Sequence, residues 1–203
     1  MTMQSTLEID QPVAPEDQVR ANMYSMLGRL MLQAPNTETM KNLVELDGGS
    51  SDVGSAVSSL AQIASALDVA SVEREFNTLF IGVGRGEILP YASYYLTGFL
   101  HEKPLADLRA NMRSLGVARK QGVPEPEDHL GSLCEVMAGL IIGAFGDPAK
   151  IQTQKEFFNA HIGPWAAHCF SDLEKSESAV LYAPVGSLGS LLIEIERESF
   201  RIE

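Results

Sequence analysis

Apolar side chains recur at steps of three and four residues along most of this chain of 203 residues. Three to four residues complete about one turn of an α-helix, so this spacing places the side chains on one helical face. The strict alternation of apolar and polar residues that is typical of a half-buried strand is not found in the sequence. The spacing therefore predicts an all-α fold. The first predicted face, after Pro15 and before Pro35, comprises Val19, Met23, Met26, Leu27, Leu30 and Met31.

The same spacing predicts a series of further helices. Thr37 is a candidate N-cap of one of them, and Asp52 is a candidate N-cap of the next. A chain of this length is most naturally one domain, so we expect eight to ten helices around one core in residues 16–203. Residues 1–15 contain few large apolar side chains and are expected to form a mobile tail. The predicted helices lie near 37–44, 52–67, 71–80, 96–115, 126–144, 148–161, 164–175 and 184–200.

Two stretches interrupt the helical spacing. Residues 82–95, GVGRGEILPYASYY, contain three glycines and a proline and are expected to be irregular. Residues 117–129, VARKQGVPEPEDH, contain two prolines and are expected to begin as extended chain. Pro126 suits the first turn of the helix that follows, where Glu127 and Asp128 would lie beside its positive end.

The charge of the chain bears on its partners and its compartment. Lys and Arg number 15 against 27 Asp and Glu, which gives a net charge of −12. A chain this acidic lacks the basic surface that binds phosphates, so nucleic acid is not an expected partner, whereas basic peptides would be attracted.

Cys134 and Cys169 are too few for a disulfide-stapled secreted fold. We see neither a signal peptide nor an apolar stretch of the roughly 20 residues that span a membrane, and expect a cytoplasmic protein.

The polar residues form no recognisable catalytic motif. Gly82, Gly84 and Gly86 lack both the GK[ST] ending of a P-loop and the last glycine of a dinucleotide fingerprint. The four histidines and two cysteines show neither CxxC nor HExxH spacing, so we expect no metal and no other cofactor. Asp128 and His129 are neighbours that would point about 100° apart on a helix, which disfavours an acid–base pair. The residues by themselves thus identify no catalytic residue.

Three tyrosines crowd the first interrupted stretch, at positions Tyr91, Tyr94 and Tyr95. Large amphipathic rings in irregular structure either anchor a bound peptide or fill the core beside a loop. The residues alone leave these two alternatives equally open.

Three blocks of the sequence fall in an order and at a spacing that are typical of one protein family. EFNTLFIGVGRGEILPYASYYL (75–96) follows the pattern E-F-x-x-L-F-x-G…P-Y-x-S-x-Y. PEPEDHLGSLCEVM (124–137) contains E-P-x-D-H, and FFNAHIGPWAAHCFSDL (157–173) contains F-x-x-H-x-x-x-W. In these blocks the chain resembles the TorD/DmsD/NarJ family of cytoplasmic chaperones, which assist the maturation of molybdenum redox enzymes.

The resemblance implies an all-α chaperone fold without enzymatic turnover. Such chaperones bind the twin-arginine leader, and often the body, of a molybdenum-containing subunit until its cofactor is inserted and the subunit is exported. By the resemblance, Asp128 would pair with an arginine of the leader, while Trp165 is expected in the core. The peptide-binding residues that it implies are Phe76, Leu79, Phe80, Pro90, Tyr91, Tyr95, Pro126, Asp128 and His129.

The resemblance leaves the identity of the client open, and also the choice between a monomer and a homodimer that swaps domains through a hinge at 117–125. Two other functions are weighed against it. One is a metal-dependent hydrolase that uses His129, and the other is a helical protein-interaction domain whose partner is not a redox enzyme.

Overall fold

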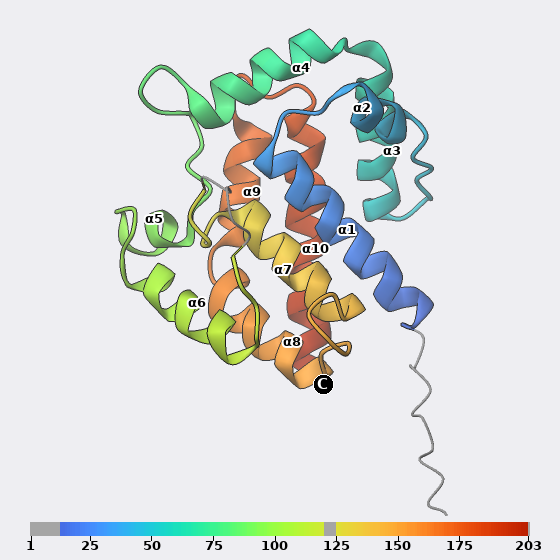
Figure 1. The fold of residues 1–203 in the computed structure, drawn as a ribbon. Helices are drawn as coiled ribbons and strands as arrows, with labels where there is room; N and C mark the ends of the chain where they lie inside the picture. The colour runs from blue at the N-terminus through green and yellow to red at the C-terminus, as the bar shows by residue number, and fades with distance from the viewer. Residues whose placement is uncertain (1–12, 120–124, 203) are drawn as a thin grey trace, which may run out of the picture.

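The computed structural model describes residues 13–119 and 125–202, which form ten α-helices and two π-helical turns (Figure 1). No strand occurs in this part of the chain, so the prediction of an all-α fold is confirmed. Most of the expected tail and the centre of the expected hinge, residues 1–12 and 120–124, lie outside the described residues. The helices are α1 (Pro15–Leu32), α2 (Thr37–Val44), α3 (Asp52–Ala66), α4 (Val69–Phe76), α5 (Ala92–Thr97), α6 (Lys103–Ser114), α7 (Leu130–Ile142), α8 (Ile151–Phe157), α9 (Ala166–Lys175) and α10 (Tyr182–Ile202), and the π-helical turns are η1 (Asn77–Ile81) and η2 (Phe158–Ile162).

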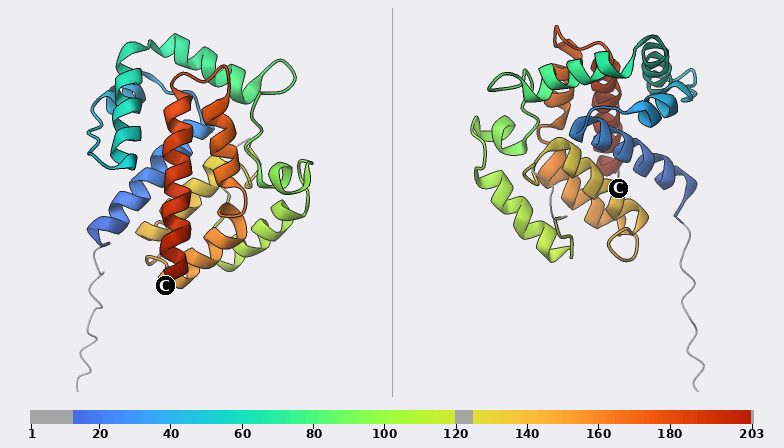
Figure 2. Two further views of the ribbon diagram at one scale, coloured as in Figure 1. Left: turned by 180° about the vertical axis from the view of Figure 1, so that it is seen from behind. Right: turned by 45° about the horizontal axis from the view of Figure 1, so that its top comes forward.

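The core is built mainly on two helix pairs, α1 against α7 and α9 against α10. The helices α2, α3 and α4 gather at one end of the molecule, and α5 and α6 lie along one side (Figures 1 and 2). Glycines allow α1 and α7 to approach closely. A Cβ on Gly131 would lie 2.6 Å from the Leu32 side chain and 2.8 Å from the carbonyl oxygen of Gly28. Gly131 is therefore needed for this helix pair to keep its present spacing.

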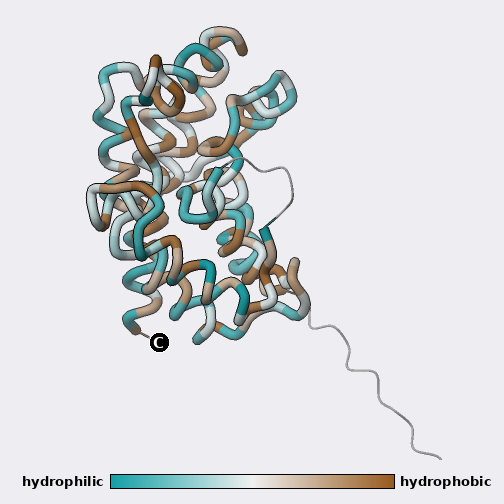
Figure 3. The backbone as a smooth tube through the Cα atoms, turned by 60° about the vertical axis from the view of Figure 1, so that its left-hand side comes forward, coloured by the Kyte–Doolittle hydropathy of each residue, from teal (hydrophilic) through white to brown (hydrophobic). Residues whose placement is uncertain are grey.

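Apolar and polar residues alternate along the backbone and do not separate into two halves of the molecule (Figure 3). This is the pattern that amphipathic helices around a shared core produce. In α1 the prediction from the three- and four-residue spacing holds for Leu27, Leu30 and Met31, each at most 1% exposed, but not for Val19, which is 58% exposed. Trp165 is also 1% exposed, so its expected place in the core is confirmed.

The helix N-caps differ from those that the sequence suggested. Asn36, Ser51 and Asp68 each accept a hydrogen bond from the backbone N–H three residues further on. Thr37 and Asp52, the expected caps, instead occupy the first helical position. Asn36 and Thr37 are neighbours whose side chains can both cap a helix, and so are Ser51 and Asp52. The prediction chose the second residue in both cases.

The prediction of irregular chain over 82–95 is wrong at its end, because α5 begins at Ala92 and includes the last two tyrosines. The continuous helix expected over 96–115 is interrupted after Thr97. Gly98 there adopts a left-handed conformation with φ +82°, and α6 begins at Lys103. Glycine takes up this conformation without the steric cost that a Cβ imposes. Gly98 therefore encodes the break in the sequence, although the apolar spacing alone did not reveal it.

The prediction that Pro126 begins a helix is also wrong, because α7 begins four residues later, at Leu130, and His129 is its N-cap. An isolated antiparallel bridge pairs His129 with Tyr91 and holds both residues in an extended conformation. The pairing partner is 38 positions away in the sequence, so local residue preferences did not reveal it.

Within the described residues, no single helix is long and apolar enough to cross a membrane, while α3 together with Val69–Ile81 meets the length and composition criteria as a pair bent by 117°.

Candidate functional site

The two interrupted stretches of the sequence meet side by side immediately before α5 and α7. Beside the bridge between Tyr91 and His129, the backbone N–H of Ala92 donates to the Asp128 carbonyl at 3.0 Å. The N–H of Leu130 donates to the Pro90 carbonyl at 2.7 Å. The fold thus joins the first two sequence blocks into one small structure.

Asp128 is buried in this structure, with 1% of its surface exposed. Its Oδ2 atom accepts a hydrogen bond of 2.9 Å from the backbone N–H of Ser93, in the first turn of α5. The expectation that Asp128 lies in the first turn of its own helix is therefore wrong, because this carboxylate caps a different one. The other oxygen, Oδ1, has no hydrogen-bond partner among the described residues, and the hydroxyl of Ser93 has none either.

Asp128 and Ser93 both line a cavity of about 280 Å³. A buried carboxylate oxygen without a partner is costly, and a hydrogen-bond donor, above all a cationic one, would relieve that cost. His101 on the cavity wall has a φ of +63°, which is uncommon for a residue with a side chain. The cavity is lined by Tyr91, Ser93, Leu100, His101, Pro126 and Asp128.

The imidazole of His129 caps a helix and does not form an acid–base pair with Asp128. Its Nδ1 atom accepts a hydrogen bond of 3.0 Å from the N–H of Gly131 and so caps α7. The side chain is 4% exposed, and burial lowers the pKa of His129 from 6.5 to about 4. His129 is consequently neutral near pH 7, and its ring packs edge-on against Tyr91 with the ring centres 5.1 Å apart.

Two further carboxylates, those of Glu125 and Glu127, flank Pro126 in the sequence and line a different hollow of about 180 Å³. The hydroxyl of Tyr91 donates to the carboxylate of Glu125, and burial followed by this hydrogen bond raises the pKa of Tyr91. Glu127 forms an ion pair of 2.8 Å with Arg109, which is 44% exposed. Burial acts to raise the pKa of Glu127, but the contact with Arg109 outweighs it and the pKa is lowered. Both carboxylates therefore already have a partner, Tyr91 for Glu125 and Arg109 for Glu127.

The structure places the remaining predicted residues apart from this cavity. Leu79 is fully buried, and Phe76 is 8% exposed. Phe76 and Phe80 pack against the ring of Tyr182 in α10, with ring centres 6.1 Å and 5.2 Å away.

Tyr95 also points elsewhere, because its ring lies 5.3 Å from that of Trp165 and its hydroxyl donates to Asp172. The cavity therefore brings together Tyr91, Pro126 and Asp128, with His129 and Pro90 directly behind them. Tyr95 thus fills the core beside the loop, whereas Tyr91 lines the cavity, and its part in binding a peptide stays a prediction.

Glu75, which opens the first sequence block, has a structural role that the sequence analysis missed. Its carboxylate is 9% exposed and accepts hydrogen bonds from three consecutive backbone N–H groups, those of Val180, Leu181 and Tyr182, at 2.7–3.1 Å. These groups lie at the start of α10, so Glu75 caps that helix from α4. The position of Glu75 beside Phe76 in the block was a sequence signal for such a role. The residues that Glu75 binds, however, are more than 100 positions away.

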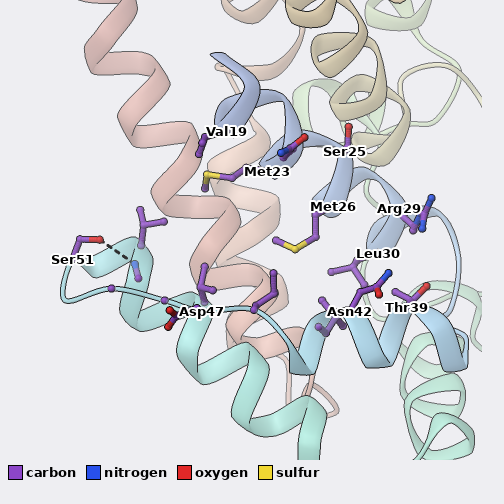
Figure 4. A pocket seen from close by; sticks show the side chains of 18 residues that line it. Val19, Met23, Ser25, Met26, Arg29, Leu30, Thr39, Asn42, Asp47 and Ser51 are labelled. Atoms are coloured by element: carbon purple, nitrogen blue, oxygen red, sulfur yellow. Dashed lines mark hydrogen bonds between the residues drawn. The ribbon is translucent and has the colours of Figure 1, made fainter. Parts of the chain in front are cut away.

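A second and larger cavity, of about 840 Å³, lies between α1, α2 and α3 (Figure 4). Its walls are largely apolar, and its lining includes two charged side chains, Arg29 at the right of the view and Asp47 left of its centre. The helical spacing predicted these three helices but not how their faces meet, so the cavity was not foreseen. Apolar side chains that line it include Val19, Met23, Met26, Leu30, Leu43, Leu46, Val53 and Val57.

In the described part of the chain, no three His, Cys, Asp or Glu side chains gather closely enough to hold a metal ion. Cys134 and Cys169 are free and buried, and burial raises the pKa of both thiols. Neither thiol is therefore ionised near pH 7, which is the form needed for nucleophilic attack or metal binding.

This fold and this site together define an all-α protein with a small cavity, acidic at Asp128, between two helix starts. The chain belongs to the nitrate reductase delta subunit family, whose family model matches residues 46–171.

Relatives with curated names give the family a more specific context. A protein named chaperone protein TorD from Vibrio cholerae is 29% identical over 130 residues, which make up 61% of this chain and 59% of the relative. The chaperone protein TorD of Photobacterium profundum is 32% identical over 99 residues, or 45% of this chain and 46% of the relative. The chain thus spans about 59% of the length of the first of these proteins.

A solved structure has a similar fold. A protein from Archaeoglobus fulgidus described as a redox enzyme maturation protein superposes with a TM-score of 0.58 over 94% of this chain and 99% of its own. Its sequence is 16% identical, so this similarity concerns the fold alone.

Proposed function

We propose that this protein is a cytoplasmic chaperone that binds the twin-arginine leader, the apo-form, or both, of a molybdenum-containing oxidoreductase subunit. In this role it holds the subunit until its cofactor is inserted and checks it before export. Membership of the nitrate reductase delta subunit family and relatives named chaperone support the proposal. The role requires neither catalysis nor a cofactor bound by the chaperone.

The unpartnered oxygen of Asp128 is the observation that carries this proposal. A guanidinium group is planar, stays charged and offers several N–H donors, so it matches a carboxylate in a confined cavity. Asp128 lines a cavity whose wall includes Tyr91 and Pro126, while its Oδ2 atom is fixed by Ser93. Asp128 is therefore already oriented before a ligand arrives, which lowers the entropy cost of binding.

The test is the affinity of a synthetic twin-arginine leader peptide for the purified protein, measured by calorimetry. Asp128→Asn keeps an oxygen that accepts from Ser93 and removes the charge, so α5 stays capped. We expect this variant to bind about 10–100-fold more weakly, the value of a hydrogen bond to a charged group. Asp147→Asn, an exposed acid with the same change in net charge, is the matched control and should bind like the wild type.

A peptide in which both arginines are replaced by glutamine should lose the same affinity as Asp128→Asn, and combining the two changes should cost little more. Equal binding by the wild type and Asp128→Asn would remove Asp128 from the site. Absence of any leader binding by the wild type would contradict the leader-binding part of the proposal.

The client itself is best identified by capture of tagged protein from cells grown with the redox enzymes induced, followed by mass spectrometry. Recovery of an unprocessed molybdoenzyme subunit is the expected result. Partners that include no such subunit would favour the alternative of a general helical interaction domain. The hydrolase alternative has less support, because the relatives are named chaperones, and stoichiometric metal in the purified protein would restore it.

A further inference from the structure

Three large apolar side chains are exposed within five consecutive residues at the turn between α5 and α6. Leu96 is 44% exposed, Phe99 70% and Leu100 40%. We call these three residues the turn patch. Burying one such side chain removes apolar surface from water, so a cluster of them at a turn favours contact with another molecule.

The turn patch is continuous with the acidic cavity. Leu100 lines the cavity of 280 Å³ together with Asp128. Leu96, at the other end of the patch, lines a different hollow of about 200 Å³ with Pro104, Leu108 and further side chains of α5, α6, α7 and η2. The order along this surface is thus carboxylate, exposed apolar side chains, then a largely apolar hollow.

The backbone of the turn presents these side chains in a fixed way. Gly98 and His101 both have positive φ, of +82° and +63°, and the hydroxyl of Thr97 accepts from the N–H of Phe99 at 3.3 Å. A positive φ at a histidine persists where the surrounding structure determines it. The turn is therefore a formed surface, unlike a chain that takes shape only on binding.

We propose that the turn patch binds the apolar stretch that adjoins the arginine pair of the leader peptide, with an arginine placed at Asp128. This inference rests on the proposed function and adds the surface that reads the second half of the leader. Charge complementarity identifies the occupant: a cationic group satisfies the Asp128 oxygen, and the adjoining surface suits uncharged apolar residues. It also replaces Phe76, Leu79 and Phe80 as the apolar part of the site, since those side chains pack into the core.

The larger cavity between α1, α2 and α3 is the competing position for the apolar stretch. It has more apolar wall, but the carboxylate oxygen that is buried without a partner lies in the other cavity, at Asp128. The acidic residue of its lining, Asp47, is exposed to solvent, so pairing with an arginine stabilises it less than it would the buried oxygen of Asp128.

The experiment is a calorimetric double-mutant cycle on the full chain. The protein variants are wild type and Phe99→Ser/Leu100→Ser, and the peptides are the leader and a leader whose apolar stretch is replaced by serine and glycine. We expect the double variant to bind the leader at least tenfold more weakly and to bind the altered peptide as the wild type does. Val180→Ser/Ile195→Ser removes apolar side chains of similar exposure elsewhere and should bind the leader like the wild type.

Circular dichroism will check that each variant is folded, and Phe99→Ser alone, at the most exposed position of the patch, should show the same direction of change. Val19→Ser, in the cavity between α1 and α3, should leave leader affinity unchanged. Unchanged leader affinity in Phe99→Ser/Leu100→Ser, or a loss confined to Val19→Ser, would overturn the inference while the proposed function stands. Dissociation of a dimer by the patch variant, without a change in leader affinity, would also overturn it and assign the patch to contacts between copies. If the wild type binds no leader, this inference fails together with the leader-binding part of the proposed function, while binding of the apo-form is still tested by the capture experiment.

Discussion

Asp128 and His129 are neighbours in the chain, yet each caps a different helix. Oδ2 of Asp128 accepts from the start of α5, and Nδ1 of His129 accepts from the start of α7. Because their polar atoms are engaged in different directions, each side chain has its own chemical consequence. Asp128 retains an unpartnered oxygen toward a cavity, whereas His129 is held neutral within the structure.

The depressed pKa of His129 predicts that stability falls as the solution becomes acidic. The unfolded chain takes up a proton near pH 6.5, but the folded protein does so only near pH 4. The contribution of His129 is therefore fully present above pH 6.5 and is lost as the pH falls toward 4, by roughly 3 kcal/mol. Urea unfolding, followed by the fluorescence of the single tryptophan, Trp165, at several pH values will measure it.

His129→Asn is the informative variant for this pH dependence, since asparagine is a good N-cap and does not titrate in this range. It should unfold with a markedly smaller loss of stability between pH 6.5 and 4. Some dependence will remain, because burial also lowers the pKa of His161. A variant that keeps the full slope of the wild type would show that His129 is not its source.

At the scale of elements, the first sequence block links α4 to the start of α10. Glu75 accepts from three backbone N–H groups there, and Phe76 and Phe80 pack on Tyr182 in the same helix. Polar and apolar contacts thus hold one junction. The block that pointed toward peptide binding in the sequence is, over its first half, a clamp between two helices.

This clamp predicts a large effect of a small change. Glu75→Ala leaves three N–H groups at the start of α10 without their acceptor and should lower the unfolding free energy by roughly 3 kcal/mol. Glu75→Gln keeps one acceptor oxygen and should lose about half as much. Both values follow from urea unfolding at pH 7, and leader binding by the folded fraction should be unchanged. Equal stability of the Ala and Gln variants would contradict the capping role.

The sequence predicted the existence of most helices but misplaced several of their starts. The three- and four-residue spacing is a local signal, and it located α1, α3 and α10 well. The start of α5 depends on Asp128, which is distant in sequence, so spacing and local caps did not reveal it. The same reason explains the site: the motif residues located Asp128 and Tyr91, while the turn patch and the cavity follow only from tertiary packing.

At the scale of the whole molecule, α1, α8 and α10 are joined by a buried ion pair. Two nitrogens of Arg20 contact both carboxylate oxygens of Glu196 at 2.7 and 2.8 Å, and Glu196 is 1% exposed. Asp17, Tyr24 and Gln154 complete the network with contacts of 2.6, 3.3 and 3.2 Å. Breaking such a pair is far more costly than replacing it, because one buried charge is left alone.

Arg20→Met should therefore lower the unfolding free energy by roughly 3–5 kcal/mol. The double variant Arg20→Met/Glu196→Leu should recover most of this loss, since both charges are then replaced by apolar groups. Urea unfolding of the two variants beside the wild type gives the comparison. A double variant that is less stable than Arg20→Met would mean that the pair itself, and not the isolated charge, dominates.

The joining of α1 to α7 and α10 also orders events during synthesis. The ribosome makes α1 first, but its close partner at Gly131 and its ionic partner at Glu196 appear only after about a hundred and about 180 further residues. The inward face of α1 therefore stays uncovered through most of translation, and the core closes only when nearly the whole chain has emerged. Chains stalled before α10 should be open to protease, so this protein itself passes through a stage in which a long unfinished chain needs protection.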